Sequence, residues 1–260
     1  MRQVYGSNKS PVSLFIEKAL EVRQITRVQG PAYNPFSYAE KLNIRVEEKK
    51  GMMLDGFLRC DQLGNFTVRL KRDAPRHRRN FTLAHEISHT FFYELLNHPK
   101  NTLRDRGFDP EEEFFCDLGA AELLMPPSTF KKDLFSDGSV TPQTLFWLVS
   151  RYDVSLQAVA NRMSFLAKNL ACVFWRKRET LIEANYVTPS YLKNIVLCQT
   201  KNSSVELAYA NQGSVVKALD SYYGLKKQKR IRRQSTSLAT SDTHVISIID
   251  LGEDLRDQLT

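Results

Sequence analysis

Two histidines and a glutamate within His85-Glu86-Ile87-Ser88-His89 have the types and spacing for metal chemistry. On a helix, side chains four residues apart leave the same face one turn apart. Two neutral imidazoles at that spacing both reach one Zn²⁺ at about 2.0–2.1 Å. Glu86, one position round from His85, is close enough to hold a water molecule without binding the ion. The motif therefore predicts a zinc site for hydrolysis, with Glu86 as the general base.

A catalytic zinc ion takes three protein ligands and leaves a fourth position to water. The next acidic cluster, Asp109 to Glu113, leads into a second helix that starts at Pro110 and ends before Pro126. Glu113 is placed to complete a His–His–Glu ligand set; the alternative is a simple charge at the positive end of this helix. Asp117, one turn later, can accept the outer N–H of a ligating histidine.

Neighbouring residues receive mostly structural interpretations. Glu111 and Glu112 are expected to stabilise the positive end of the second helix, and Glu122 to face solvent. Cys116 is expected to be a small buried residue rather than a second nucleophile. Tyr93, one turn past the histidines, is the candidate oxyanion stabiliser, with a place in the core as the alternative.

The helix that carries the histidines is predicted to be buried on most sides. Asp73 and Pro75 suit its first turn. Apolar residues then follow at Phe81, Leu83, Ala84, Ile87, Phe91, Phe92, Leu95 and Leu96. Histidines inside such a helix need partners for their ring nitrogens, and a metal ion provides them.

Two motifs together resemble the ImmA/IrrE metallopeptidases. They are Phe81-Thr82-Leu83-Ala84-His85-Glu86-Ile87-Ser88-His89 and, after Glu113, Gly119-Ala120-Ala121-Glu122-Leu123-Leu124-Met125-Pro126. The resemblance covers residues 10–165, and Ile87-Ser88 with Cys116 is more similar to the radiation-response branch than to the immunity branch. It implies a bacterial zinc endopeptidase that cleaves a helix-turn-helix (XRE-type) repressor, in a stress or DNA-damage response or in mobile-element induction.

The apolar pattern in the rest of the first 130 residues predicts the helices and strands that position the site. Helices are expected at 12–28 and 35–42, and strands at 44–46, 51–60 and 66–70. We expect a small antiparallel sheet with 66–70 at its edge, where an extended substrate chain adds as a further strand. The fold class is α+β, with a zincin-like metallopeptidase core over residues 1–130.

Residues 131–169 form a helix-turn-helix-like segment, with helices from Thr141-Pro142 and at 156–166. The second of these helices carries one basic residue, whereas a DNA-reading helix normally carries more. We therefore expect a structural or partner-docking element.

Residues 170–260 are expected to form a small α/β module. The pattern predicts strands at 172–175, 180–182 and 244–249, and helices at 191–198 and 215–223. By position alone, the module resembles the GAF-type sensor domain of the radiation-response branch.

Composition is typical of a soluble globular protein, with 42% hydrophobic and 25% charged residues. The sequence shows neither a signal peptide nor a membrane-spanning run, so we expect a cytoplasmic protein without a membrane partner. The four cysteines, Cys60, Cys116, Cys172 and Cys198, are widely spaced, which is typical of free thiols in a reducing compartment.

The net charge of +8 is concentrated in two runs. They are Arg69, Lys71, Arg72, Arg76, Arg78 and Arg79, and then Lys226, Lys227, Lys229, Arg230, Arg232 and Arg233. Both could hold nucleic acid by counterion release. We favour a solvated face for the first and a mobile loop for the second, with nucleic-acid binding weak and non-specific at most.

The sequence thus predicts a zinc-dependent endopeptidase with one Zn²⁺ per chain, Mn²⁺ or another divalent ion being the alternative. The rival function is a DNA-binding or scaffolding regulator with a non-catalytic metal site. Glu86 argues against the rival, because a structural zinc ion has no use for a base and is more often closed by cysteine.

Overall fold

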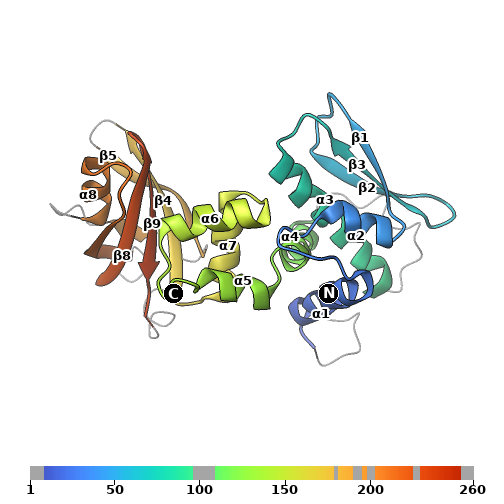
Figure 1. Cartoon of the computed structure of the whole chain (residues 1–260), viewed down its shortest axis with the longest axis horizontal. Coiled ribbons are helices and arrows are strands. Elements are labelled where there is room, and N and C mark those ends of the chain that lie inside the picture. The colour runs from blue at the N-terminus through green and yellow to red at the C-terminus, as the bar shows by residue number, and fades with distance from the viewer. Residues whose placement is uncertain are drawn as a thin grey trace. The chain divides into compact units, whose positions relative to one another are not determined.

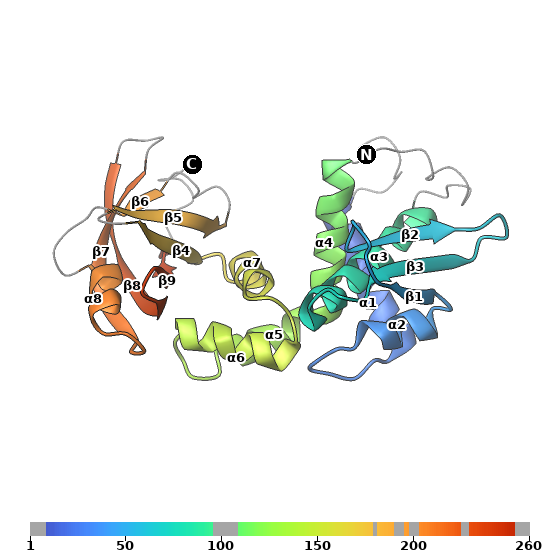
Figure 2. The ribbon, with the colours of Figure 1, turned by 90° about the horizontal axis from the view of Figure 1, so that it is seen from above.

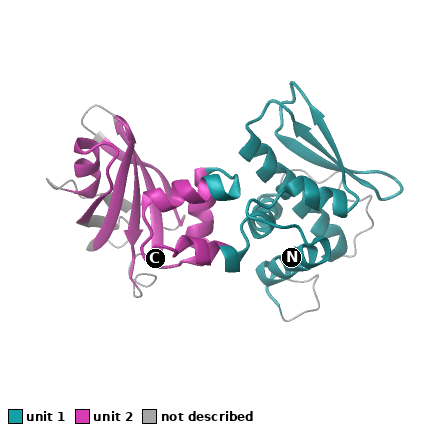
Figure 3. Cartoon of the chain, in the orientation of Figure 1, with its two compact units in different colours: residues 1–129, 150–155 teal, residues 130–149, 156–260 magenta. Residues whose placement is uncertain are grey.

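The computed structural model describes residues 9–95, 109–178, 181–189, 195–197, 203–224 and 229–252. The chain forms two compact units, residues 1–129 with 150–155 and residues 130–149 with 156–260 (Figure 3). The three-part division expected from the sequence stays a prediction. Among the described helices, none has the length and apolar character needed to cross a membrane.

The first unit combines helices with a small sheet, which confirms the α+β class (Figure 1). Its elements are α1 (Pro11–Thr26), α2 (Pro35–Lys41), β1 (Arg45–Lys49), β2 (Gly56–Cys60), β3 (Phe66–Lys71), α3 (Arg76–Leu95) and α4 (Pro110–Leu124). Two further helices, α5 (Pro127–Leu134) and α6 (Pro142–Tyr152), run across the boundaries of the units.

The three strands lie in the order β1-β3-β2, so β3 is the central strand. β2 is antiparallel to β3, as expected, but β1 is parallel to it, so the prediction of a purely antiparallel sheet is wrong for β1. The prediction of an edge at 66–70 is also wrong. Strand β3 lies between β1 and β2, which form the edges of the sheet, and its Val68 and Leu70 are fully buried. Alternation along one strand does not reveal how many neighbours it has.

Helix α3 lies against this sheet (Figure 2) and is buried along Leu83, Ala84, Ile87, Phe91 and Phe92. The edge strand β2 comes very close to it. A Cβ atom added at Gly56 would lie 2.5 Å from Thr82 Cγ2, so glycine is needed for this approach. The open edge of the sheet therefore runs beside the helix that carries the histidines.

Aromatic rings tie α1, α3 and α4 together. The ring of Phe15 lies 4.7 Å from that of Phe92, 5.1 Å from that of Phe115 and 5.9 Å from that of Phe91. All four side chains are almost fully buried. Burial of each contributes roughly 1.5–3 kcal/mol, so this cluster fixes α4 against α3.

Helix α4 begins where the sequence predicts, with Pro110 in its first turn and Asp109 as its N-cap accepting from the Glu111 backbone N–H. A small residue sets its distance from α3. A Cβ atom at Gly119 would lie 2.5 Å from Ser88 Oγ and 2.8 Å from Ser88 Cβ. The backbone of α4 at Gly119 therefore contacts the side chain of Ser88 on α3. This close packing brings the preceding part of α4 next to the histidines on α3.

The second unit is built on a six-stranded sheet in the order β5-β4-β9-β8-β7-β6, in which neighbouring strands are antiparallel. Its elements are α7 (Leu156–Leu166), β4 (Leu170–Arg178), β5 (Leu181–Thr188), β6 (Ile195–Leu197), α8 (Ser204–Ala210), β7 (Val216–Gly224), β8 (Lys229–Ser241) and β9 (His244–Asp250). Helix α8 lies against this sheet (Figure 1). Its Val205 and Ala208 belong to one buried cluster with Trp175, Val245 and Ile249 of the sheet.

Several predictions for this unit are wrong. Residues 216–224 form strand β7 rather than a helix, and 195–197 form strand β6 within the second expected helix. The other residues of that helix, 191–194 and 198, lie outside the described residues, as does Thr180. Helix α8 was not expected, and residues 229–233 of the second basic run lie in strand β8 rather than in a loop. Local patterns fail here because cross-strand pairing over the whole sheet decides the conformation.

The helices α6 and α7 lie where the sequence places the helix-turn-helix-like segment, with Asp153 at positive φ between them. Whether they act as a helix-turn-helix stays a prediction, and so does the GAF-type assignment of the sheet.

Candidate metal centre

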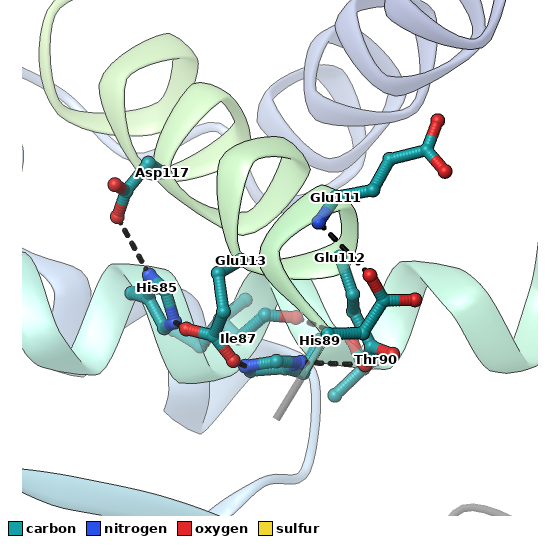
Figure 4. Close-up of polar contacts among 9 residues, drawn as sticks. His85, Ile87, His89, Thr90, Glu111, Glu112, Glu113 and Asp117 are labelled. Atoms are coloured by element: carbon teal, nitrogen blue, oxygen red, sulfur yellow. Dashed lines mark hydrogen bonds and ion pairs between the residues drawn. The ribbon is translucent and has the colours of Figure 1, made fainter. Parts of the chain in front are cut away.

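His85 and His89 stand one turn apart on α3, with ring centroids 5.0 Å apart. Each Nδ1 atom faces its own carboxylate on α4 (Figure 4). His85 Nδ1 lies 2.9 Å from Asp117 Oδ1, and His89 Nδ1 lies 3.1 Å from Glu112 Oε1. A carboxylate accepts the Nδ1–H, so both rings are held in the tautomer whose Nε2 lone pair is free to bind a metal ion.

Both Nε2 atoms face Glu113 (Figure 4). The distance to its carboxylate is 3.1 Å from His85 and 3.8 Å from His89, each to a different oxygen. Two imidazole nitrogens and one carboxylate that meet in this way are a donor set suited to a catalytic Zn²⁺. The residues present therefore fit the ion that the motif predicts.

The electrostatics of the site favour a cation. Burial lowers the pKa of His85, yet the hydrogen bond that its Nδ1–H donates to Asp117 and the charges of Glu86, Asp117 and Glu113 raise it overall. The protonated form of His85, and with it a positive charge among these carboxylates, is thus favoured despite the burial.

Glu86 lies between α3 and the sheet, and its side chain is buried. Burial raises the pKa of its carboxyl group, the nearby His89 and His85 lower it, and Glu113 raises it again. The backbone N–H of Leu58 in β2 donates to this carboxylate. A carboxyl group with a raised pKa, held by a backbone amide beside the two histidines, is suited to act as a general base.

Cys116 follows Glu113 by one turn on α4 and is fully buried, as expected. Its Sγ atom and one ring nitrogen each of His85 and His89 lie within 4.8 Å of one another. Burial and the nearby carboxylates, Glu112 first, raise the pKa of the thiol. The sequence interpretation saw the burial but not the proximity to the histidines. The three-residue spacing from Glu113 is the signal that could have revealed it.

The remaining site residues have separate environments. The ring of Tyr93 packs edge-on against Phe66 of β3, with centroids 4.9 Å apart, and its role with an oxyanion stays a prediction. Glu122 is buried with 4% exposure, so the expectation that it faces solvent is wrong. Glu112, assigned only a helix-end charge from the sequence, contacts His89 instead.

Carboxylates partner much of the first basic run. Arg69 pairs with Glu47 at 2.9 Å, Arg76 with Asp153 at 2.7 Å, Arg78 with Asp55 and Arg79 with Glu48. These arginines tie α3 and β3 to neighbouring segments. In the second run, Lys226 and Lys227 lie outside the described residues, and Arg233 Nε donates to the Leu251 carbonyl at 3.0 Å.

The helix pair and its ligand arrangement define a metallopeptidase-like protein. Comparison with known families gives the same class, since residues 39–164 match the Peptidase_M78 model, described as the IrrE N-terminal-like domain. The match covers 126 of the 260 residues and supports the resemblance that the sequence motifs show. The match does not separate the radiation-response branch from the immunity branch.

A solved structure described as a Mycobacterium tuberculosis transcriptional regulator has a similar fold. The TM-score is 0.54 at 13% sequence identity, and the similarity covers 90% of this chain and 74% of that one. At this identity the likeness concerns the fold alone. Among curated proteins, none matches the chain.

Proposed function

We propose that the protein is a zinc-dependent endopeptidase with one Zn²⁺ per chain. The observation that carries this proposal is the meeting of His85 Nε2, His89 Nε2 and the Glu113 carboxylate beside the buried Glu86. A donor set of two histidines and a glutamate with an adjacent base is the arrangement that hydrolytic zinc sites use.

His85, His89 and Glu113 would hold the ion, while Asp117 and Glu112 keep both imidazoles in the binding tautomer. When bound, zinc supplies a Lewis acid that polarises the scissile carbonyl and lowers the pKa of a water molecule.

Glu86 moves the protons of the reaction. It takes one proton from the attacking water molecule while the water oxygen bonds to the scissile carbon, and it gives that proton to the leaving amine as the C–N bond breaks. Its carboxyl group ends in its starting state. The Leu58 backbone N–H keeps the carboxylate aimed at this position.

We propose that the substrate binds along the edge strand β2. This strand pairs with β3 on one side, and the Leu58 N–H on its other side reaches Glu86. An extended peptide that adds to this edge would lie beside the base and the histidines. This assigns to β2 the role that the sequence suggested for residues 66–70.

The proposed substrate is a helix-turn-helix repressor, which rests on the family resemblance, and the proposed location is the cytoplasm. The ion pairs of the first basic run support a protein substrate rather than nucleic acid, because much of that run's charge is already neutralised.

The test uses the full chain loaded with zinc and incubated with the repressor encoded nearest to its gene. We expect one defined cut by mass spectrometry, abolished by a chelator and restored by zinc. The matched control is Glu86→Gln, which removes the base and keeps the ligands. Equal cleavage by Glu86→Gln would overturn the proposal.

A further inference from the structure

Cys116 is the buried group at the site that the proposed reaction does not use. It lies on α4 one turn after Glu113, with its thiol fully shielded from solvent. Among the residues that the structure describes, its Sγ atom joins His85 and His89 in a group of potential metal donors within 4.8 Å of one another. Cys60 and Cys172 are also buried thiols, but neither belongs to this group.

We propose that Cys116 is itself a metal ligand, whose thiolate binds the ion together with His85 and His89. The inference rests on the proposed function, since it concerns the same ion. α4 then offers two donors one turn apart, the partly exposed Glu113 and the buried Cys116. With both bound, four protein atoms surround the ion, and the position for water opens only when Cys116 leaves.

The chemistry of the donors supports this assignment. Zinc binds thiolate at about 2.3 Å and imidazole at about 2.0–2.1 Å, so a histidine pair and a thiol this close can converge on one ion with small side-chain movements. On binding, the S–H bond breaks, a sulfur–metal bond forms and the proton goes to solvent, with no change in oxidation state.

A thiolate ligand also determines which ion the site selects. Thiolates prefer zinc and other soft or borderline ions, whereas carboxylate and water ligands suit Mn²⁺. Cys116 thus favours Zn²⁺ over Mn²⁺, the alternative that the histidine motif leaves open.

The experiment uses the full chain, stripped with a chelator and reloaded with Co²⁺ alone. We expect a thiolate-to-cobalt charge-transfer band in the near ultraviolet. Cys116→Ser and Cys116→Ala should lose this band, while Cys60→Ser, which alters a buried thiol in the same unit, should keep it. Zn²⁺ affinity of Cys116→Ser should fall by at least about tenfold, since residues outside the ligand set alone affect affinity by this much.

The outcomes separate this inference from the proposed function. Stoichiometric Co²⁺ binding without the band, or a band that survives in Cys116→Ser, overturns the thiolate ligand and leaves the His–His–Glu peptidase standing. Failure of the wild-type chain to bind Co²⁺ or Zn²⁺ overturns both. The wild-type spectrum decides the matter even if both Cys116 variants misfold.

Discussion

His89 Nδ1 lies 3.1 Å from Glu112 Oε1, on the same helix whose Asp117 holds His85 Nδ1 at 2.9 Å. The later histidine on α3 thus contacts the earlier carboxylate on α4, so the two helices run in opposite directions where they touch. Steps of four residues on α3 and five on α4 keep the two contacts in register. The pairs fix both imidazoles before any ion is bound.

Removal of either carboxylate should weaken metal binding without removing a ligand. We expect Glu112→Ala and Asp117→Ala each to reduce Zn²⁺ affinity by about 10–100-fold, because the imidazoles lose their fixed tautomer and orientation. Competition with a chromophoric chelator measures this. Glu111→Ala is the control, since Glu111 lies in the same turn and its carboxylate points away from both histidines (Figure 4). Equal effects in all three variants would contradict the assignment.

Glu113→Ala should reduce Zn²⁺ affinity by at least about tenfold and abolish cleavage, because it removes the carboxylate that faces both Nε2 atoms. The double variant Glu113→Ala/Cys116→Ser should lose the ion more completely than either single variant. Metal analysis after dialysis measures both effects. Unchanged zinc content and activity in Glu113→Ala would rule out its role as a ligand.

Glu86→Gln should fold, bind zinc with little change in affinity and lose cleavage by at least about 10²-fold, which is the low end for loss of a general base. The amide cannot take a proton from water. Single-turnover cleavage, with metal content measured in parallel, separates chemistry from binding. A variant that lost its zinc would instead make Glu86 a structural part of the site.

Gly119→Ala should destabilise the first unit by roughly 1–3 kcal/mol, the usual cost of overpacking a close contact. The added Cβ atom would meet Ser88 Oγ at 2.5 Å and Ser88 Cβ at 2.8 Å. Urea unfolding gives the difference. Ser88→Ala in the same chain should recover part of the loss, because it removes the nearer atom; a Gly119→Ala protein as stable as wild type would contradict the packing described.

Binding to DNA, if measured, should be weak and should fall steeply with salt, because the candidate reading helix α7 carries one basic residue. Replacement of Lys229 and Arg230 in β8, together with Lys226 and Lys227 outside the described residues, should lower this affinity for all sequences alike. Peptidase activity should stay unchanged. A tight, salt-resistant complex with one operator would favour the regulator function instead.

The sequence predicts well what depends on spacing within one helix. His85, Glu86 and His89 follow from the helical period, and Pro110 and Pro126 bound α4 closely. The spacing does not predict how α4 is rotated about its own axis, and this rotation decides which of its side chains lie near the histidines. Only Glu113 and Asp117 were expected to reach the histidines, whereas Glu112 and Cys116 of α4 also lie close to them.

The sheets show the same limit. The strands near 44–70 and at 172–175 and 244–249 follow from local patterns, but their neighbours do not. β3 became central because the chain places β2 on one side of it and β1 on the other. The apolar run of β7 suits a helix as well as a strand, and pairing with β8 decides between them.

The first and last strands of the six-stranded sheet, β4 and β9, are direct neighbours. Leu170 pairs with Asp250, and the Leu251 N–H donates to the Asn169 carbonyl at 2.7 Å. The polypeptide thus enters and leaves this sheet at two adjacent strand ends. The beginning and the end of this segment, residues 170–251, therefore lie side by side, the arrangement that allows a domain to be inserted into a chain at one point.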